Sequence, residues 1–195
     1  MKNIFWASTF LLLISTSAFA DGPFGVTMGT PIKNYTACQP GDTVSFYRCS
    51  TLPRTHPDME FYIVESWPET GACFVKGIGN TISVDVYGVT LRKKVDEIAA
   101  QMSETYGKAN KTDFLMVGSI WKDPRDWSMA ILKQERYYYH NWSIQTGAQL
   151  KDGITRIYVA GKALSTDKGY VVVEFYFQNA ASCEDAERRA KARAF

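Results

Sequence analysis

One segment, residues 90–107, constrains the fold of this chain more than any other. Thr90 precedes it as a suitable N-cap residue, and Gly107 stands where glycine commonly ends a helix. Between them the apolar residues recur at helical spacing and form one stripe: Leu91, Val95, Ile98, Ala99, Met102 and Tyr106. A helix with a single apolar stripe needs a surface to cover, so this segment predicts a helix packed on a sheet.

Strand patterns elsewhere in the chain supply that sheet. Aromatic and β-branched residues, some in strict alternation, predict strands over residues 60–67, 72–78, 81–87, 114–117, 128–143, 154–163 and 170–178. A short C-terminal helix is expected from Ser182, with Ser182 as its cap and Asp185 three residues on. Because strands come in runs with helices segregated between them, the predicted fold class is α+β. We expect an antiparallel sheet packed against one long helix, with a short C-terminal helix and an irregular, disulfide-stapled N-terminal segment.

Residues 1–20 have the features of a cleaved export signal. Lys2 gives a positive start, a short apolar run follows, and Ala18-Phe19-Ala20 fits the small-x-small pattern of a cleavage site. The run is too short for a membrane span, and no cysteine lies next to the cleavage point to carry a lipid. We therefore expect a periplasmic or secreted protein without a membrane anchor.

The remaining residues, 21–195, are expected to form a single α+β domain. Gly-Val-Thr occurs twice, at residues 25–27 and 88–90. The second copy leads into the predicted helix, whereas the first leads towards a proline. This repeat leaves open a duplication, with related subunits at 24–86 and 87–180.

The chain contains four cysteines, all outside the expected leader. In an oxidising compartment four cysteines predict two disulfides, although their number alone does not fix which cysteines pair. We favour Cys38–Cys49, which would staple the irregular segment before residue 57. The other pair is then Cys73–Cys183, which would tie the C-terminal tail to the middle of the chain.

Composition excludes several classes of partner and cofactor. The formal net charge of the chain is +2, and it falls to +1 without Lys2. The charges are interspersed, so there is neither the basic stripe of a nucleic-acid-binding protein nor a polybasic membrane patch. No Cys-x-x-C occurs, and His56 and His140 are isolated from the cysteines in sequence. We therefore expect no metal and no other cofactor.

The densest group of aromatic and polar residues is the segment 137–142. In a strand, Tyr138, His140 and Trp142 would share one face, and the residues between them the other. Aromatic side chains with polar tips suit a surface that stacks on a glycan or seats a protein loop. These three are therefore candidate binding residues. The alternative is that they pack in the sheet, because one face must be buried.

A second candidate is the loop between two tryptophans. It carries charges of both signs and would present Trp121, Arg125 and Trp127 to a ligand or partner. The alternative is structural: Asp-Pro starts a turn at Asp123, and the two tryptophans cover the sheet edge on either side.

The sequence holds no recognisable catalytic motif. Gly-x-Ser-x-Gly and His-Glu-x-x-His do not occur, and no nucleophile motif accompanies His140, so no catalytic residue is assigned. The expected function is a non-catalytic binding or interaction module of the cell envelope, with a protein or glycan as ligand and inhibition as one such role. A hydrolase of envelope polymers is the alternative, because two carboxylates can converge from anywhere in a fold. The acids available for such a pair are Glu65, Glu69, Asp123, Asp126 and Glu174.

The opening Phe24-Gly25-Val26-Thr27-Met28-Gly29 resembles the start of small exported proteins of Gram-negative bacteria. Those proteins begin with Phe-Gly, a variable stretch and a second Gly, and continue with strands and a helix ending in Tyr-Gly, as at Tyr106-Gly107. This chain departs from them by a Pro- and Cys-rich insertion at 31–57. Its helix and sheet are also similar to units of β-lactamase-inhibitor-like and outer-membrane-assembly lipoprotein folds. The resemblance implies an exported protein and supplies no catalytic residues.

Overall fold

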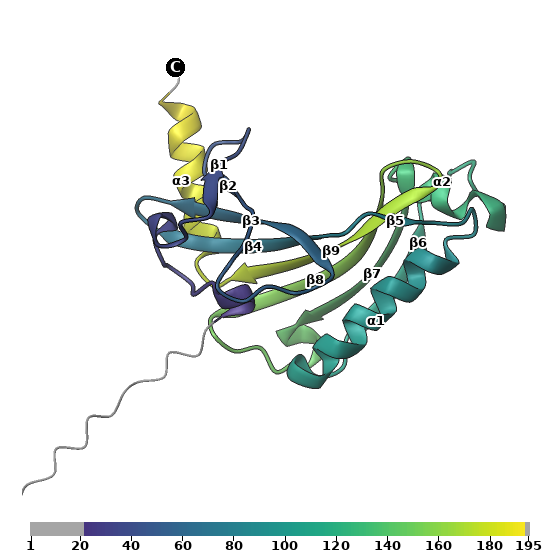
Figure 1. Ribbon diagram of the computed structural model, residues 1–195, viewed down its shortest axis with the longest axis horizontal. Coiled ribbons are helices and arrows are strands. Elements are labelled where there is room, and N and C mark those ends of the chain that lie inside the picture. Colours follow the sequence, from purple (N-terminus) through teal and green to yellow (C-terminus); the bar gives the residue numbers. More distant parts are fainter. Residues whose placement is uncertain (1–21, 194–195) are drawn as a thin grey trace, which may run out of the picture.

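An antiparallel sheet of nine strands organises the protein (Figure 1). The computed structural model describes residues 22–193, so the expected export signal at residues 1–20 lies outside the described part. In spatial order the strands are β1 (Cys38–Pro40), β2 (Phe46–Cys49), β3 (Met59–Trp67), β4 (Gly71–Gly79), β9 (Lys168–Phe177), β8 (Ile154–Ala163), β7 (Arg136–Ser143) and β6 (Asn110–Leu115). A short strand, β5 (Ile82–Ser83), pairs with the start of β9.

The topology joins two meanders at their inner strands. Strands β1 to β4 follow one another, as do β6 to β9, and the β4–β9 ladder connects the two runs. The sheet is strongly bent, with helix α3 (Ala180–Ala192) at one end and helix α2 (Trp127–Leu132) at the other (Figure 1). The predicted α+β class with an antiparallel sheet is therefore confirmed. The sheet is larger than expected, because β1 and β2 extend it into the segment predicted to be irregular.

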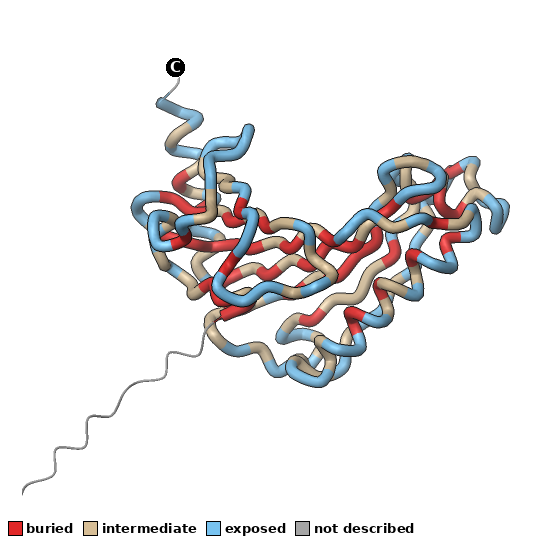
Figure 2. The backbone as a smooth tube through the Cα atoms, viewed as in Figure 1, coloured by how far each residue is buried: buried red, intermediate tan, exposed pale blue. Residues whose placement is uncertain are grey.

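Helix α1 (Val89–Tyr106) covers one face of the sheet at β7, β8 and β9. Leu91, Val95 and Ile98 of its stripe are buried, and Figure 2 shows buried and exposed segments alternating along the helix. Gly161 on β8 allows the close approach, because a Cβ atom there would lie 3.0 Å from Leu91 Cγ. The predicted helix and its packing on a sheet are both confirmed.

The start of α1 differs from the expectation. The carboxylate of Asp85 accepts hydrogen bonds from the backbone N–H groups of Val89 (3.2 Å) and Thr90 (2.9 Å), so Asp85 and not Thr90 satisfies the first turn. Gly88 precedes the helix with φ +66°, and a Cβ atom there would fall 1.8 Å from the Trp127 ring. Of the strand predicted over 81–87 only β5 forms, because the residues after it belong to this turn.

The N-terminal segment covers the same face of the sheet beyond α1. The ring of Phe24 packs against Tyr62 of β3 and Phe175 of β9, at centroid distances of 4.8 Å and 5.6 Å. Val26 is fully buried beside them. The segment is therefore part of the core, although short 3-10 turns rather than helices or strands make up its first residues.

Other boundaries also differ from the sequence prediction. The strand expected over 114–117 is β6, which spans Asn110–Leu115. The strand expected over 128–143 is wrong in its first part, because residues 127–132 form α2 with Trp127, Ala130 and Ile131 buried. The C-terminal helix begins at Ala180, with Asn179 at the N-cap position but without a side-chain cap hydrogen bond, so Ser182 lies inside the helix. None of the described helices is long and apolar enough to span a bilayer.

Both favoured disulfides are confirmed. Cys38–Cys49 joins β1 to β2, where the two cysteines are direct partners in the ladder. Cys73–Cys183 joins β4 to α3 and lies in a small core with Trp67 and Ala186. Two disulfides are typical of a protein that folds in an oxidising compartment.

The two cross-links should differ in their contribution to stability. Their sequence separations are 11 and 110 residues, and in the chain-entropy account the longer loop stabilises by about 2 kcal/mol more. We expect Cys73→Ala with Cys183→Ala to lower the free energy of unfolding more than Cys38→Ala with Cys49→Ala. Urea denaturation of the two double variants checks this ranking, and the reverse ranking would contradict it.

Candidate functional site

The structure turns Tyr138, His140 and Trp142 inward, beneath α1. Tyr138 is 3% exposed and Trp142 is fully buried. The Trp142 indole N–H donates to the carbonyl oxygen of Gly107 at 2.7 Å, where α1 ends. The His140 side chain beside them is 13% exposed. A surface patch made of these three side chains is therefore contradicted, and the packing alternative describes them.

Asp96 on α1 forms hydrogen bonds with polar side chains from β6 and β7. Its Oδ1 lies 2.7 Å from His140 Nε2, the Tyr138 hydroxyl donates to it at 2.8 Å, and Lys111 Nζ donates to Oδ2 at 2.8 Å. Burial alone would raise the pKa of Asp96, but hydrogen bonds from Lys111, His140 and Tyr138 outweigh it and hold the pKa below its ordinary value. The network ties α1 to β6 and β7.

An Asp–His pair is also part of the hydrolytic triads, which makes this network the first place to look for chemistry. Within the described residues no serine or cysteine is hydrogen-bonded to His140, and all four cysteines are in disulfides. The adjacent pocket between α1 and β6 is lined by Asp96 and Glu97. Because the pKa of Asp96 is lowered, its carboxylate does not suit the general acid of a glycosidase.

Of the candidate residues in the loop at 121–127, some lie at the surface and one lies in the core. Trp127 is buried, with its ring edge-on to Tyr138 at a centroid distance of 5.8 Å. Arg125 is exposed, and its Nε donates to Asp123 Oδ1 at 3.1 Å. Trp121 is half-buried. Arg125 and the exposed part of Trp121 therefore remain accessible to a partner, and Trp127 does not.

An apolar turn precedes that loop. The backbone N–H of Ser119 donates to the carbonyl of Met116 at 3.1 Å, and Gly118 has φ +88°. Val117 at the tip is 98% exposed, and Ile120 is 76% exposed. Other exposed large apolar residues lie at the end of β6 and just after it, at the start of α1 and just before it, and at the start of β7: Phe114, Met116, Val86, Tyr87, Val89 and Tyr137. Apolar side chains gathered on a surface are typical of a contact with another protein.

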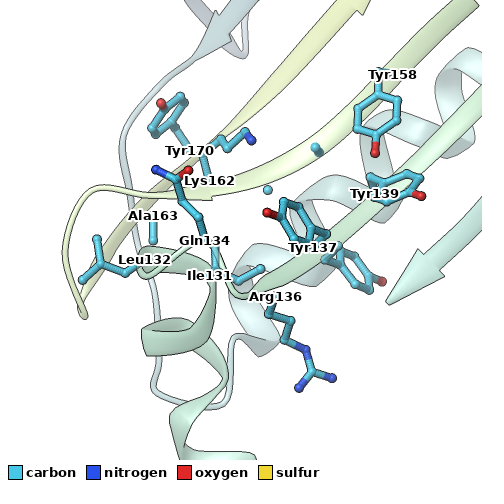
Figure 3. A pocket seen from close by; sticks show the side chains of 13 residues that line it. Ile131, Leu132, Gln134, Arg136, Tyr137, Tyr139, Tyr158, Lys162, Ala163 and Tyr170 are labelled. Atoms are coloured by element: carbon cyan, nitrogen blue, oxygen red, sulfur yellow. The ribbon is translucent and has the colours of Figure 1, made fainter. Parts of the chain in front are cut away.

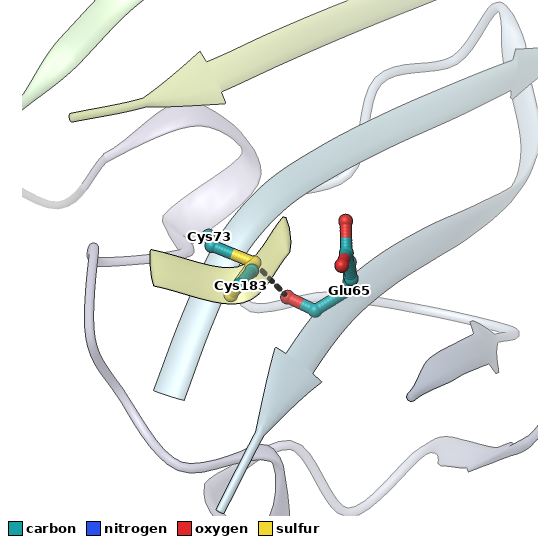
Figure 4. Close-up of side chains that lie close together, drawn as sticks. All are labelled: Glu65, Cys73 and Cys183. Carbon is teal, nitrogen blue, oxygen red and sulfur yellow. Dashed lines mark hydrogen bonds between the residues drawn. A yellow bond between two sulfur atoms is a disulfide. The ribbon is translucent and has the colours of Figure 1, made fainter. Parts of the chain in front are cut away.

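Glu65, Cys73 and Cys183 bring potential metal-ligand atoms within 4.8 Å of one another (Figure 4). The two sulfur atoms are joined in a disulfide, whereas a metal site requires thiolates. Burial raises the pKa of Glu65, and the negative charges of Glu187 and Glu184 act in the same direction against a hydrogen bond from Trp67. The cluster is therefore a covalent cross-link beside one carboxyl group.

Strands β7 and β8 separate at one end of the sheet and form a fork. They pair from Tyr139–Ala160 onward, whereas Arg136–Tyr138 pair with β6 and Gly161–Ala163 pair with β9. A pocket of about 300 Å³ opens in the fork beside the end of α2 (Figure 3). We call it the fork pocket, and the aromatic residues that line it are Tyr137, Tyr138, Tyr139, Tyr158 and Tyr170.

The polar groups of the fork pocket come from different elements. Gln134 follows α2, Arg136 begins β7 and Lys162 ends β8. In Figure 3, Gln134 and Lys162 lie on the Tyr170 side of the pocket, and Tyr139 and Tyr158 lie on the other side. The pocket therefore presents aromatic rings on one side and hydrogen-bond donors on the other.

The aromatic side of the pocket is a stacked pair. The rings of Tyr139 and Tyr158 lie 4.4 Å apart with an interplanar angle of 25°. Burial, and then the neighbouring Tyr139 hydroxyl, raise the pKa of Tyr158 far above its ordinary value. The Tyr158 hydroxyl is protonated at physiological pH, as it would be at its ordinary pKa, and can both donate and accept a hydrogen bond.

Gln134 occupies a backbone position that favours glycine. Its φ is +58°, and it ends α2 in a hydrogen-bonded cap, with its own N–H on the Ile131 carbonyl (3.0 Å) and the Glu135 N–H on the Ala130 carbonyl (2.9 Å). A side chain in this left-handed conformation costs about 1 kcal/mol relative to glycine. Strain of this kind collects at functional sites, and here it places an amide in the fork pocket.

The strand that carries this site was predicted, but the residues predicted to bind lie on its inward face. The alternation at 137–142 signals that Tyr137 and Tyr139 face opposite to Tyr138, which places them outward once α1 covers the inner face. Lys162 and Tyr170 are direct cross-strand partners in the β8–β9 ladder. That pairing, and the position of Gln134, depend on tertiary structure and carry no local signal.

No known protein family, curated protein or solved structure matches the chain. The resemblance of its opening to small exported proteins therefore stays an expectation.

Replacing Asp96 should produce a pH-dependent loss of stability. The folded pKa of Asp96 is below its ordinary value of 3.8, so its carboxylate stabilises the fold above that pH and ceases to do so as the pH falls through the folded value. We expect Asp96→Asn to be less stable than the wild type at neutral pH, with the difference shrinking in acid. Urea denaturation from about pH 2 to about pH 7 measures this difference. A difference independent of pH would contradict the assignment.

Replacing Glu65 should act in the opposite sense. Because the folded pKa lies above its ordinary value of 4.5, the folded state favours the protonated carboxyl, and ionisation weakens the fold as the pH rises through the folded value. We expect Glu65→Gln to become more stable than the wild type as the pH rises through the folded pKa of Glu65, as measured by thermal unfolding at a series of pH values. Exposed Glu69→Gln is the matched control, and an equal gain in that variant would refute the prediction.

Proposed function

We propose that this chain is an exported binding module, periplasmic or secreted, that binds a glycan in the fork pocket and catalyses no reaction. One observation carries the proposal: stacked tyrosine rings and a strained glutamine amide converge on a single pocket. A volume of about 300 Å³ is at the lower end of the range for small-molecule sites and suits one or two sugar rings.

Sugars need this combination of side chains. Their rings have apolar C–H faces that pack on aromatic rings, as Tyr139 and Tyr158 offer, and their hydroxyl groups lose water on binding. Each buried hydroxyl must regain a partner, because an unpaired polar group costs about 1–3 kcal/mol. The Tyr158 hydroxyl and the Gln134 amide both donate and accept, which matches groups that also do both.

The alternative, a hydrolase with a carboxylate pair, has less support. No aspartate or glutamate lines the fork pocket among the residues that the structure describes. Glu174 is paired with Lys76 at 2.8 Å, and Asp123 with Arg125 at 3.1 Å. These acids are held by separate neighbours rather than facing each other across a cleft, as glycoside hydrolysis requires.

A protein partner is the second candidate, and the exposed apolar turn at Met116–Ser119 favours it. The turn is near β6 and α2 but does not line the fork pocket. Val117→Ser therefore tests the two functions separately: it should leave glycan affinity unchanged, and a loss of affinity would mean that the turn belongs to the glycan site.

Two substitutions in the pocket should weaken binding for different reasons. We expect Tyr139→Ala to reduce affinity about tenfold through loss of the stacked ring. Gln134→Gly should also reduce affinity, while raising the free energy of unfolding by about 0.5–1 kcal/mol, because glycine relieves the left-handed strain. A variant that is more stable but binds less tightly separates function from folding.

The measurement is calorimetric titration of the mature protein with soluble oligosaccharides, supported by saturation-transfer NMR. The panel contains neutral oligomers of N-acetylglucosamine and galactose and acidic oligomers of galacturonate. Tyr47→Ala on β2 is the control, because Tyr47 is a half-buried strand tyrosine outside the fork pocket. Absence of binding across the panel, or equal loss in Tyr47→Ala and Tyr139→Ala, would overturn the proposal.

A further inference from the structure

The charged residues that line the fork pocket are of one sign. Among its described lining residues Arg136 and Lys162 are cationic, and none is acidic. The guanidinium of Arg136 is already occupied, because its Nε and Nη2 donate to the two oxygens of Asp113 at 2.7 Å and 2.9 Å. The charge that remains available to a ligand is the ammonium group of Lys162.

Lys162 differs from two of the strand lysines, Lys76 and Lys111, in its ion pairing. Lys76 on β4 pairs with Glu174, and Lys111 on β6 pairs with Asp96, each at 2.8 Å. Within residues 22–193 no carboxylate lies within ion-pair distance of Lys162. A solvated ammonium beside a pocket is the arrangement that an anionic ligand can use without first breaking an existing ion pair.

The neighbours of Lys162 define the kind of anion. Figure 3 shows the Lys162 ammonium and the Gln134 amide on the same side of the pocket, across from the stacked rings of Tyr139 and Tyr158. An ammonium and an amide NH2 both supply N–H donors, which suit the two oxygens of a carboxylate. One unpaired cation also balances a single negative charge, whereas a phosphate monoester carries nearly two.

We propose that the fork pocket selects an acidic sugar, with its carboxylate on Lys162 and Gln134 and its ring against Tyr139 and Tyr158. This inference rests on the proposed glycan function and adds the ligand class. Hydrogen bonds to charged groups are stronger than neutral ones, so the acidic sugar should bind about tenfold more tightly than its neutral counterpart.

The test compares two trimers of the same α-1,4 linkage, trigalacturonate and galactotriose, by calorimetry with the full mature protein. They differ only at C6 of each ring, which is a carboxylate in the acidic trimer and a hydroxymethyl group in the neutral one. The acidic trimer should bind about tenfold more tightly at low salt, and added salt should narrow the gap. Lys162→Gln should bring the two affinities together, while Lys162→Arg should keep the preference. Lys168→Gln removes a nearby exposed charge outside the pocket and should leave the preference intact.

The outcomes separate the two proposals. Equal affinity for both trimers in the wild type would overturn the acidic-sugar inference and leave glycan binding standing. A preference that survives Lys162→Gln, or that Lys168→Gln abolishes, would also overturn it. If neither trimer nor any other sugar of the panel binds, both proposals fail. Thermal unfolding of each variant confirms that it is folded at the temperature of the titration.

Discussion

The burial of the α1 stripe against β7, β8 and β9 is the contact on which the rest of the structure depends. Each large apolar side chain buried there contributes about 1.5–3 kcal/mol, and glycine at 161 lets the helix approach the sheet closely. The contact also decides the use of the neighbouring polar residues. Asp96 lies at the edge of the helix, so it can hold Tyr138 and His140 only while α1 is in place. The side chains on the inner face of β7 are therefore used in packing and in hydrogen bonds to α1.

The fork pocket is a consequence of burying the inner face of β7 under α1. Because alternate residues of a strand face opposite ways, burying Tyr138 directs Tyr137 and Tyr139 to the other face. Where β7 leaves β8, α2 lies beside the gap, and its left-handed cap residue Gln134 faces the tyrosines. Helix, cap and strand separation thus act together, and a strained backbone provides a polar group that an ordinary glycine cap would lack.

The sequence predicts what depends on local periodicity and on compartment. The α1 stripe, the strands with alternating residues and both disulfides were predictable from the sequence, because each leaves a repeated or paired signal. The helix at 127–132 was not, because its residues before β7 form one aromatic and apolar run that equally fits a strand. The face of β7 that lines the fork pocket was not predictable from the sequence either. Choosing between Tyr138 and Tyr139 requires knowing which face α1 covers, and that is a tertiary fact.

The disulfide between Cys73 and Cys183 has a mechanical consequence. It connects β4, the last strand of the first meander, directly to the last helix. Tension applied to the two ends of the described chain therefore passes from residue 73 to residue 183 through the sulfur atoms. The segment between them, which contains α1, most of β4 and all of β5 to β9, lies in a covalent loop that carries none of this load. The fork pocket is inside that loop, so pulling on either terminus cannot stretch the strands that form it.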